Sequence, residues 1–89
     1  MYNGHKDWAH WNVSLWLYND QDMYNLMVFE AKKARSRVDA ARHIMNAIIG
    51  GYRVPLKTGY RLEGDKALTP DGAVYTAARI YEALEGFEW

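Results

Sequence analysis

The chain has 89 residues, of which 49% are hydrophobic, 15% aromatic and 25% charged, and it contains no cysteine. This composition favours one folded domain spanning 1–89 and excludes a disordered profile, a disulfide framework, a thiolate nucleophile and a cysteine-based zinc site. The formal net charge is zero. Neutrality argues against a DNA mimic, which needs a dense acidic surface, and against a dedicated nucleic-acid binder, which is usually basic.

The charges are unevenly distributed along the chain. Residues 1–30 hold one lysine against four acids, a charge of −3, and residues 68–89 hold one arginine against four acids, again −3. Residues 31–67 hold nine lysines and arginines against three acids, which gives +6. A local basic surface in the middle of the chain is therefore possible.

The first expected helix runs from Trp8 to the Asn19-Asp20 pair, with Asp7 as its N-cap. A step of 100° per residue gathers apolar side chains in one broad sector, and we expect that sector to be core. Its members are Trp8, Trp11, Asn12, Leu15 and Trp16. Asn12 would then be a buried amide, and we expect it to bond the backbone of a neighbouring segment. The alternative is an exposed tryptophan platform for bases or sugars.

The same stretch carries a family resemblance. The residues concerned are Asn3-Gly4, Asp7-Trp8, Trp11-Asn12-Val13, Leu15-Trp16-Leu17, Asn19-Asp20 and Tyr24. They resemble small proteins of bacteriophages and other mobile elements, whose N-terminus reads roughly NGW-x-N-Y-x-T-W-x-V-x-L-W-L-x-N-D-E-x-x-Y. The chain departs from this pattern at His5, Trp8, His10 and Gln21. The resemblance covers about the first quarter of the chain and implies a phage-borne accessory protein, without an assigned reaction or cofactor.

Apolar residues at helical spacing continue from Met23 to Ile49, which permits one long helix. However, Ser36 followed by Asp39 three residues later is typical of a capping box. We therefore expect two helices, over about 21–35 and 37–49, with Gly50-Gly51 ending the second.

Residues 52–68 contain one proline and two glycines and lack helical periodicity. We expect either an irregular functional loop or a short hairpin with the arms 52–54 and 60–62. The segment combines aromatic and cationic groups, a combination typical of binding surfaces: Tyr52, Arg53, Lys57, Tyr60 and Arg61. The alternative is that the tyrosines pack inward and the cations are simply solvated.

Thr69-Pro70-Asp71-Gly72 has the pattern of a helix start, with Thr69 as N-cap and Pro70 in the first turn. We expect a final helix up to Gly86, after which Phe87 and Trp89 fold back onto the core. The complete prediction is an all-α fold, a compact bundle of about four helices with an irregular loop or short hairpin at 52–68.

We find no pattern that predicts catalysis. The spacing of His5, His10 and His43 does not suit a helical zinc site, and the chain lacks phosphate-binding glycine loops and a nucleophile elbow. The prediction is therefore no enzyme, with no catalytic residue, no metal and no cofactor. No apolar run is long enough to span a membrane, and the polar start is unlike a secretory signal, so we expect a cytoplasmic protein. The resemblance to phage proteins implies that the cell is a bacterial host.

Two function classes remain. The first is a protein-binding inhibitor of a host defence system, such as anti-CRISPR or anti-restriction, whose partner is a host protein or defence complex. The second is a nucleic-acid-binding accessory protein that uses the basic segment 32–61. The expected contact residues are Lys32, Lys33 and Arg37 together with the cations and tyrosines of the 52–68 segment. The sequence leaves the partner's identity and the oligomeric state open.

Overall fold

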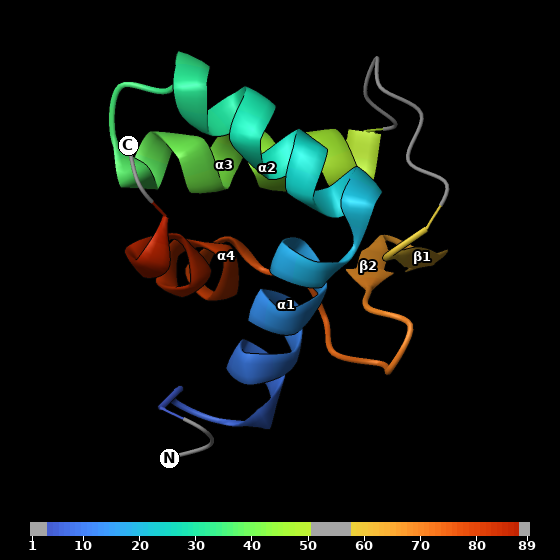
Figure 1. The fold of residues 1–89 in the computed structure, drawn as a ribbon. Helices are drawn as coiled ribbons and strands as arrows, with labels where there is room; N and C mark the ends of the chain where they lie inside the picture. Colours follow the sequence, from blue (N-terminus) through green and yellow to red (C-terminus); the bar gives the residue numbers. More distant parts are fainter. Residues whose placement is uncertain (1–3, 51–57, 88–89) are drawn as a thin grey trace.

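A computed structural model of the protein describes residues 4–50 and 58–87, and these are mainly α-helical (Figure 1). The elements follow in the order α1 (Trp8–Asn19), α2 (Gln21–Lys33), α3 (Arg37–Gly50), β1 (Arg61–Glu63), β2 (Lys66–Leu68), α4 (Ala77–Ala83) and the 3₁₀ turn η1 (Leu84–Gly86). Helices α2 and α3 lie side by side above α1 and α4 (Figure 1), and strand β2 of the hairpin contacts α3. Helix α4 contacts both α1 and α3, so the last helix joins the first to the third.

The starts of α1 and α2 form as the sequence predicts. The Asp7 carboxylate accepts a hydrogen bond from the His10 amide at 2.9 Å, and Asp20 caps α2 in the same way. The break between α2 and α3 is also confirmed. Ser36 Oγ accepts from the Asp39 amide at 3.1 Å, while an Asp39 carboxylate oxygen accepts from the Arg35 amide at 3.2 Å. This reciprocal pair satisfies free amides at the start of α3 and makes two helices more favourable than one.

The core lies where the four helices meet. Its largest fully buried apolar side chains are Val13, Leu17, Met23, Leu26, Met27, Ile44, Ile48, Tyr75, Ile80 and Leu84. Every helix contributes to it, and Tyr75 contributes from the segment before α4. The partly buried Phe87 packs against this core, as expected, whereas Trp89 lies outside the described residues.

The predicted core sector of α1 is only partly correct, because its Asn12 is fully buried but its tryptophans are not. Trp8 is 41% exposed, and Trp11, Leu15 and Trp16 are only partly buried, whereas Val13 and Leu17 are completely buried. The buried sector is thus rotated by roughly a quarter turn from the tryptophan sector. The reason is that α1 is apolar around most of its circumference, so its own periodicity does not choose a face. Contacts with α2 and α4 make that choice.

The 52–68 segment contains a hairpin, but its arms differ from the expected ones. Antiparallel β1 and β2 pair Leu62 with Ala67 and Glu63 with Lys66, so only Gly64 and Asp65 form the turn. Gly64 has φ +62, a left-handed conformation that glycine adopts at no steric cost. The expected arm at 52–54 lies outside the described residues.

The predicted helix start at Thr69 is also wrong. The Gly72 amide donates to the Thr69 carbonyl at 2.9 Å, and Gly72 has φ +100, so residues 69–72 form a turn. Proline and aspartate at its centre are as typical of a turn as of a helix start. The chain after the turn runs beside β2, where the Tyr75 amide donates to the Ala67 carbonyl at 2.8 Å. Helix α4 begins only after Thr76, whose hydroxyl accepts from the Arg79 amide at 3.1 Å.

Candidate functional site

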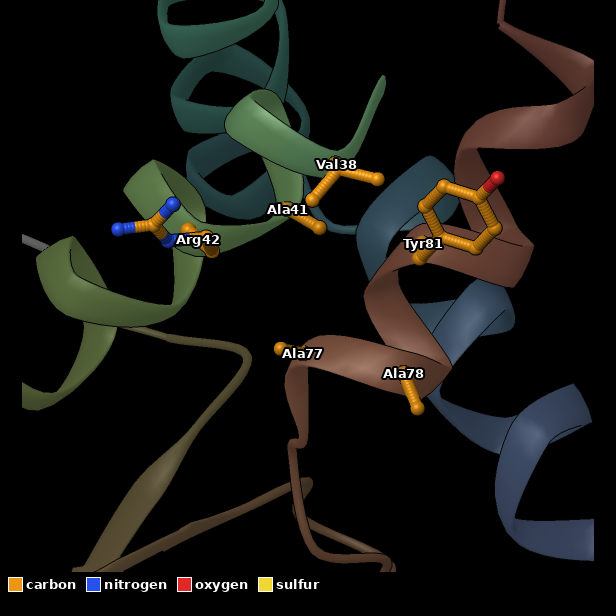
Figure 2. Close-up of a pocket in the computed structure, with 6 residues that line it drawn as sticks. All are labelled: Val38, Ala41, Arg42, Ala77, Ala78 and Tyr81. Atoms are coloured by element: carbon orange, nitrogen blue, oxygen red, sulfur yellow. The ribbon is translucent and has the colours of Figure 1, made fainter. Parts of the chain in front are cut away.

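A hollow of about 220 Å³ lies between α3 and α4, and its lining is almost entirely apolar. Figure 2 shows the side chains that line it: Val38, Ala41 and Arg42 from α3, and Ala77, Ala78 and Tyr81 from α4. The alanines are too small to close the space between the two helices. The larger side chains of Val38, from α3, and Tyr81, from α4, form walls of the hollow.

An exposed apolar stripe continues from this hollow along α3. Val38 is 54% exposed and Ile49 is 46% exposed, and the partly buried Met45 lies between them in sequence. The spacing of seven and then four residues places the three side chains on one face of the helix. The adjoining face of α3, about 100° around the helix from this stripe, enters the core through Ile44 and Ile48. Helix α3 is therefore apolar on two sides, and only one of them is covered.

Two arginines border the hollow in different ways. The Arg37 guanidinium lies over the Tyr81 ring, 4.0 Å from its centroid, and 3.9 Å from a carboxylate oxygen of Glu85. Arg37 thus supports the tyrosine wall by a cation–π contact. The Arg42 guanidinium extends away from the centre of the hollow (Figure 2), and within residues 4–50 and 58–87 no ion pair or hydrogen bond engages it. Arg42 is a cation available to a partner at the edge of an apolar surface.

Several of the predicted basic residues that the structure describes lie beside carboxylates. Lys33 lies 3.6 Å from Glu30 and 4.2 Å from the centroid of the Phe29 ring, and Arg61 lies 2.7 Å from Glu63. With Arg37 beside Glu85, three predicted cations have an acidic neighbour. Lys32 is exposed at the end of α2, and Tyr60 packs partly buried against the core. Tyr52, Arg53 and Lys57 lie outside the described residues.

The expected buried amide of α1 does find partners, although they are side chains. Asn12 is 1% exposed; its Nδ2 donates to Asp71 Oδ2 at 2.8 Å, and its Oδ1 accepts from the Thr69 hydroxyl at 2.5 Å. Trp16 Nε1 also donates to Asp71 Oδ2, at 2.9 Å. These two bonds, from Asn12 first and then Trp16, hold the pKa of the Asp71 carboxyl below its ordinary value. The network fixes the 69–72 turn to α1 and has a structural role.

Histidines and carboxylates meet in two further places. His10 Nδ1 lies 2.8 Å from Asp7, its Nε2 lies 3.6 Å from Glu82, and His5 bonds Glu82 directly. The hydrogen bond from the His10 amide is the main cause that lowers the pKa of Asp7. These contacts connect the N-terminal segment to α4. Within the described part of the chain, no group of three or more His, Cys, Asp and Glu side chains could hold a metal ion.

The second place where a histidine meets carboxylates is at Glu30, which the sequence pattern did not identify as a site residue. This carboxylate is 2% exposed, and one of its oxygens lies 3.5 Å from His43 Nδ1. His43 Nε2 lies 3.4 Å from Asp39, so the imidazole lies between two carboxylates. The position of Glu30 among Leu26, Met27 and Ala31 on one face of α2 is the sequence signal that points to a buried acid.

The sequence pattern also did not identify the residues of the hollow as a site, because their spacing is that of core residues. Val38, Met45 and Ile49 share the helical spacing of the buried residues of α3, and spacing alone does not show which apolar face stays open. The distinguishing signal is that α3 has apolar residues on two faces.

The chain belongs to DUF7249, a family of unknown function, whose model matches residues 1–84. Neither the curated proteins nor the solved structures contain a match to the chain. In the described residues, no helix has the length and apolar character needed to cross a membrane.

Proposed function

We propose that this DUF7249 protein works by binding another protein through the α3–α4 face, defined as the hollow together with Val38, Met45 and Ile49. In this proposal it is a phage-type accessory protein in the cytoplasm of the bacterial host cell. Its partner is a component of a host defence system, such as a CRISPR–Cas or restriction complex, which it inhibits by covering a working surface.

The observation that carries the proposal is the exposed apolar stripe that ends in an apolar hollow. Covering such area releases about 25 cal/mol for each Å² of apolar surface removed from water, so an open stripe next to a hollow favours association. Tyrosine and arginine, which dominate binding hot spots, border the hollow as Tyr81, Arg37 and Arg42. The N-terminal resemblance to phage proteins supports the biological context.

Binding rather than catalysis is favoured by how the titratable groups are used. Asp7, Asp20 and Asp39 accept backbone hydrogen bonds at helix starts. His10 and Glu82 connect the N-terminal segment to α4. None of these five side chains lines the α3–α4 hollow. The hollow therefore offers apolar contact and one cation, which suit recognition.

The alternative, nucleic-acid binding through segment 32–61, is weakened by the carboxylates beside Lys33, Arg37 and Arg61. A cation that already has an acidic neighbour releases fewer counterions on meeting a phosphate. Binding to duplex DNA that weakens by roughly 0.9 log unit per log unit of salt for each phosphate contact would favour the alternative over our proposal.

The test compares two variants, Val38→Asp and Leu62→Asp, whose wild-type side chains are almost equally exposed. Val38 on the face is 54% exposed, and Leu62 on the hairpin is 53% exposed. We expect Val38→Asp to abolish protection of phage or plasmid DNA against a panel of host defence systems, and Leu62→Asp to retain it. Affinity capture is done with the wild type, Val38→Asp and Leu62→Asp as baits. It should recover one partner with the wild type and with Leu62→Asp, but not with Val38→Asp. Equal behaviour of both variants would contradict the proposal.

A further inference from the structure

We propose that the segment docking on the α3–α4 face is an amphipathic helix of the partner, with one large apolar side chain for the hollow and a carboxylate for Arg42. This inference rests on the proposed protein-binding function and specifies the chemistry of the partner. Three independent features of the α3–α4 face support it: the size of the hollow, the length of the stripe and the charge at its edge.

The size of the hollow favours a side chain over a small-molecule ligand. Pockets that bind drug-sized ligands have volumes of about 300–1,000 Å³, whereas this hollow has about 220 Å³. Its alanines leave a recess between the walls formed by Val38 and Tyr81 (Figure 2). A single leucine, methionine or phenylalanine inserted there would bury its own surface and that of both walls. This is the anchor-in-pocket arrangement that dominates interface energies.

The length of the stripe favours a helix as the docking element. Val38 and Ile49 are eleven residues apart on one helix face, which corresponds to roughly 16 Å at 1.5 Å per residue. A helix lying along this stripe would place side chains from about three of its turns against Val38, Met45 and Ile49. Helices that dock in this way contact their groove at positions i, i+3, i+4 and i+7.

The charge at the edge favours an acidic segment. Helix α3 carries one acidic residue, Asp39, which lies 3.4 Å from His43 and is thus directed to the α2 side of the helix. Arg37 and Glu85 at the other edge of the hollow pair with each other, so the uncompensated charge next to the stripe is that of Arg42, which lacks a carboxylate partner within residues 4–50 and 58–87. A glutamate beside the apolar positions of the docking helix would supply that carboxylate in a bidentate geometry.

The same charge argues against a second copy of this chain as the occupant. A two-fold symmetric dimer places the same surface on both sides of the interface. Stripe against stripe would bring the two Arg42 guanidinium groups to one interface without an acid from either α3 stripe. Like charges desolvated together are unfavourable. A partner with the opposite charge fits better.

The test compares two synthetic helical peptides with the same leucines at i, i+3, i+4 and i+7, flanked by glutamates in one and by lysines in the other. We expect the glutamate peptide to bind the full-length protein at least about tenfold more tightly, measured by fluorescence anisotropy. The amide NMR signals that shift should be those of Val38, Arg42 and Met45. Equal affinities, or no binding of the glutamate peptide up to millimolar concentration, would overturn the inference.

Matched variants locate the charge effect. Arg42→Gln and Lys66→Gln remove the same charge, from the α3–α4 face and from the exposed β2 strand. We expect Arg42→Gln to weaken the glutamate peptide about tenfold and Lys66→Gln to change its affinity less than twofold. Arg42→Glu should reverse the preference between the two peptides. An Arg42→Gln affinity equal to that of the wild type would contradict the assignment.

Two results separate this inference from the proposed function. If the peptides do not discriminate while Val38→Asp still abolishes protection and capture, the protein-binding function stands and the acidic helix is wrong. If sedimentation shows a wild-type dimer that Val38→Asp dissociates, a second copy occupies the face and the inference is also wrong. Loss of neither protection nor capture in Val38→Asp would instead remove the proposed function itself.

Discussion

The α1 side of the molecule and the α3–α4 face have opposite chemistry. On the α1 side, Asn12 is buried and its amide bonds two side chains of the 69–72 turn. On the α3–α4 face, Val38 and Ile49 are about half exposed and Arg42 lacks a described partner, so apolar and charged groups stay uncovered. The buried amide of α1 has its partners inside the chain, whereas the exposed groups of the α3–α4 face can be covered by a partner from outside.

This difference separates stability from recognition in a chain of 89 residues. A domain of this size buries only about 60–65% of its unfolded surface, so each buried residue contributes a large share of the stability. On the α3–α4 face, Ala41 belongs to that core and Met45 and Tyr81 pack against it, whereas Val38 and Ile49 are about half exposed. We expect substitutions on the α1 side to change the free energy of unfolding, and those on the face to change binding.

The largest expected effect tests which face of α1 is buried. Leu17→Ala should lower the free energy of unfolding by about 2–5 kcal/mol, because Leu17 is fully buried and its truncation leaves a cavity. Leu15→Ala, two positions away and only partly buried, should cost about 1 kcal/mol. Urea unfolding followed by circular dichroism measures both values. A larger loss for Leu15→Ala would restore the tryptophan sector as the core face.

The second effect concerns the buried amide. Asn12→Ala removes two hydrogen bonds and deprives the Thr69 hydroxyl and the Asp71 carboxylate of a partner, so it should cost about 1–3 kcal/mol. At about 4–8 °C for each kcal/mol, the midpoint of thermal unfolding should fall clearly. The control is Asn46→Ala on the exposed side of α3, which should remain within about 0.5 kcal/mol of the wild type. Equal midpoints for the two variants would show that the network is not stabilising.

The third effect is a pH dependence that originates at Asp71. Its pKa is lower in the folded state than its ordinary value of 3.8, chiefly because of the bonds from Asn12 and Trp16. The unfolded chain therefore binds this proton more readily than the folded one. The contribution is fully present above the ordinary aspartate pKa and is lost as the pH falls through the lower folded pKa.

Asp71→Asn makes this dependence measurable. The stability difference between the wild type and Asp71→Asn should be constant from pH 7 to pH 5 and should shrink below pH 4. Asp65→Asn, in the exposed hairpin turn, serves as the control for a simple change of charge. Urea titrations at each pH give the comparison, and a difference that stays unchanged down to pH 2 would contradict the assignment to Asp71.

The smallest expected effect on stability lies on the α3–α4 face. Val38→Asp and Leu62→Asp should each change the free energy of unfolding by less than about 0.5–1 kcal/mol, because both side chains are about half exposed in the free protein. The loss of partner binding in Val38→Asp would then reflect the surface itself. A fall of several kcal/mol for Val38→Asp alone would instead place the valine in the core.

The N-terminal half of the fold was predictable, because local chemistry determines it. Asp7, Asp20 and Ser36 cap three helices through bonds to amides two or three residues away, and such bonds need no tertiary context. The Thr69 turn was not predictable in the same way. Threonine, proline and aspartate suit both a helix start and a turn, and pairing of residues 73–75 with β2 selects the turn.

The sequence by itself determined that the chain is mainly helical and where α1, α2 and α3 begin, since spacing and capping act over one helical turn. Only the tertiary structure decided which sides of those helices are covered. Helix α1 is apolar almost all round and α3 is apolar on two faces, so packing partners choose the buried side. Helix α4 lies against α1 and α3, but its alanines leave a hollow beside Val38. Val38 and Ile49 remain about half exposed, and with that hollow they form the candidate site.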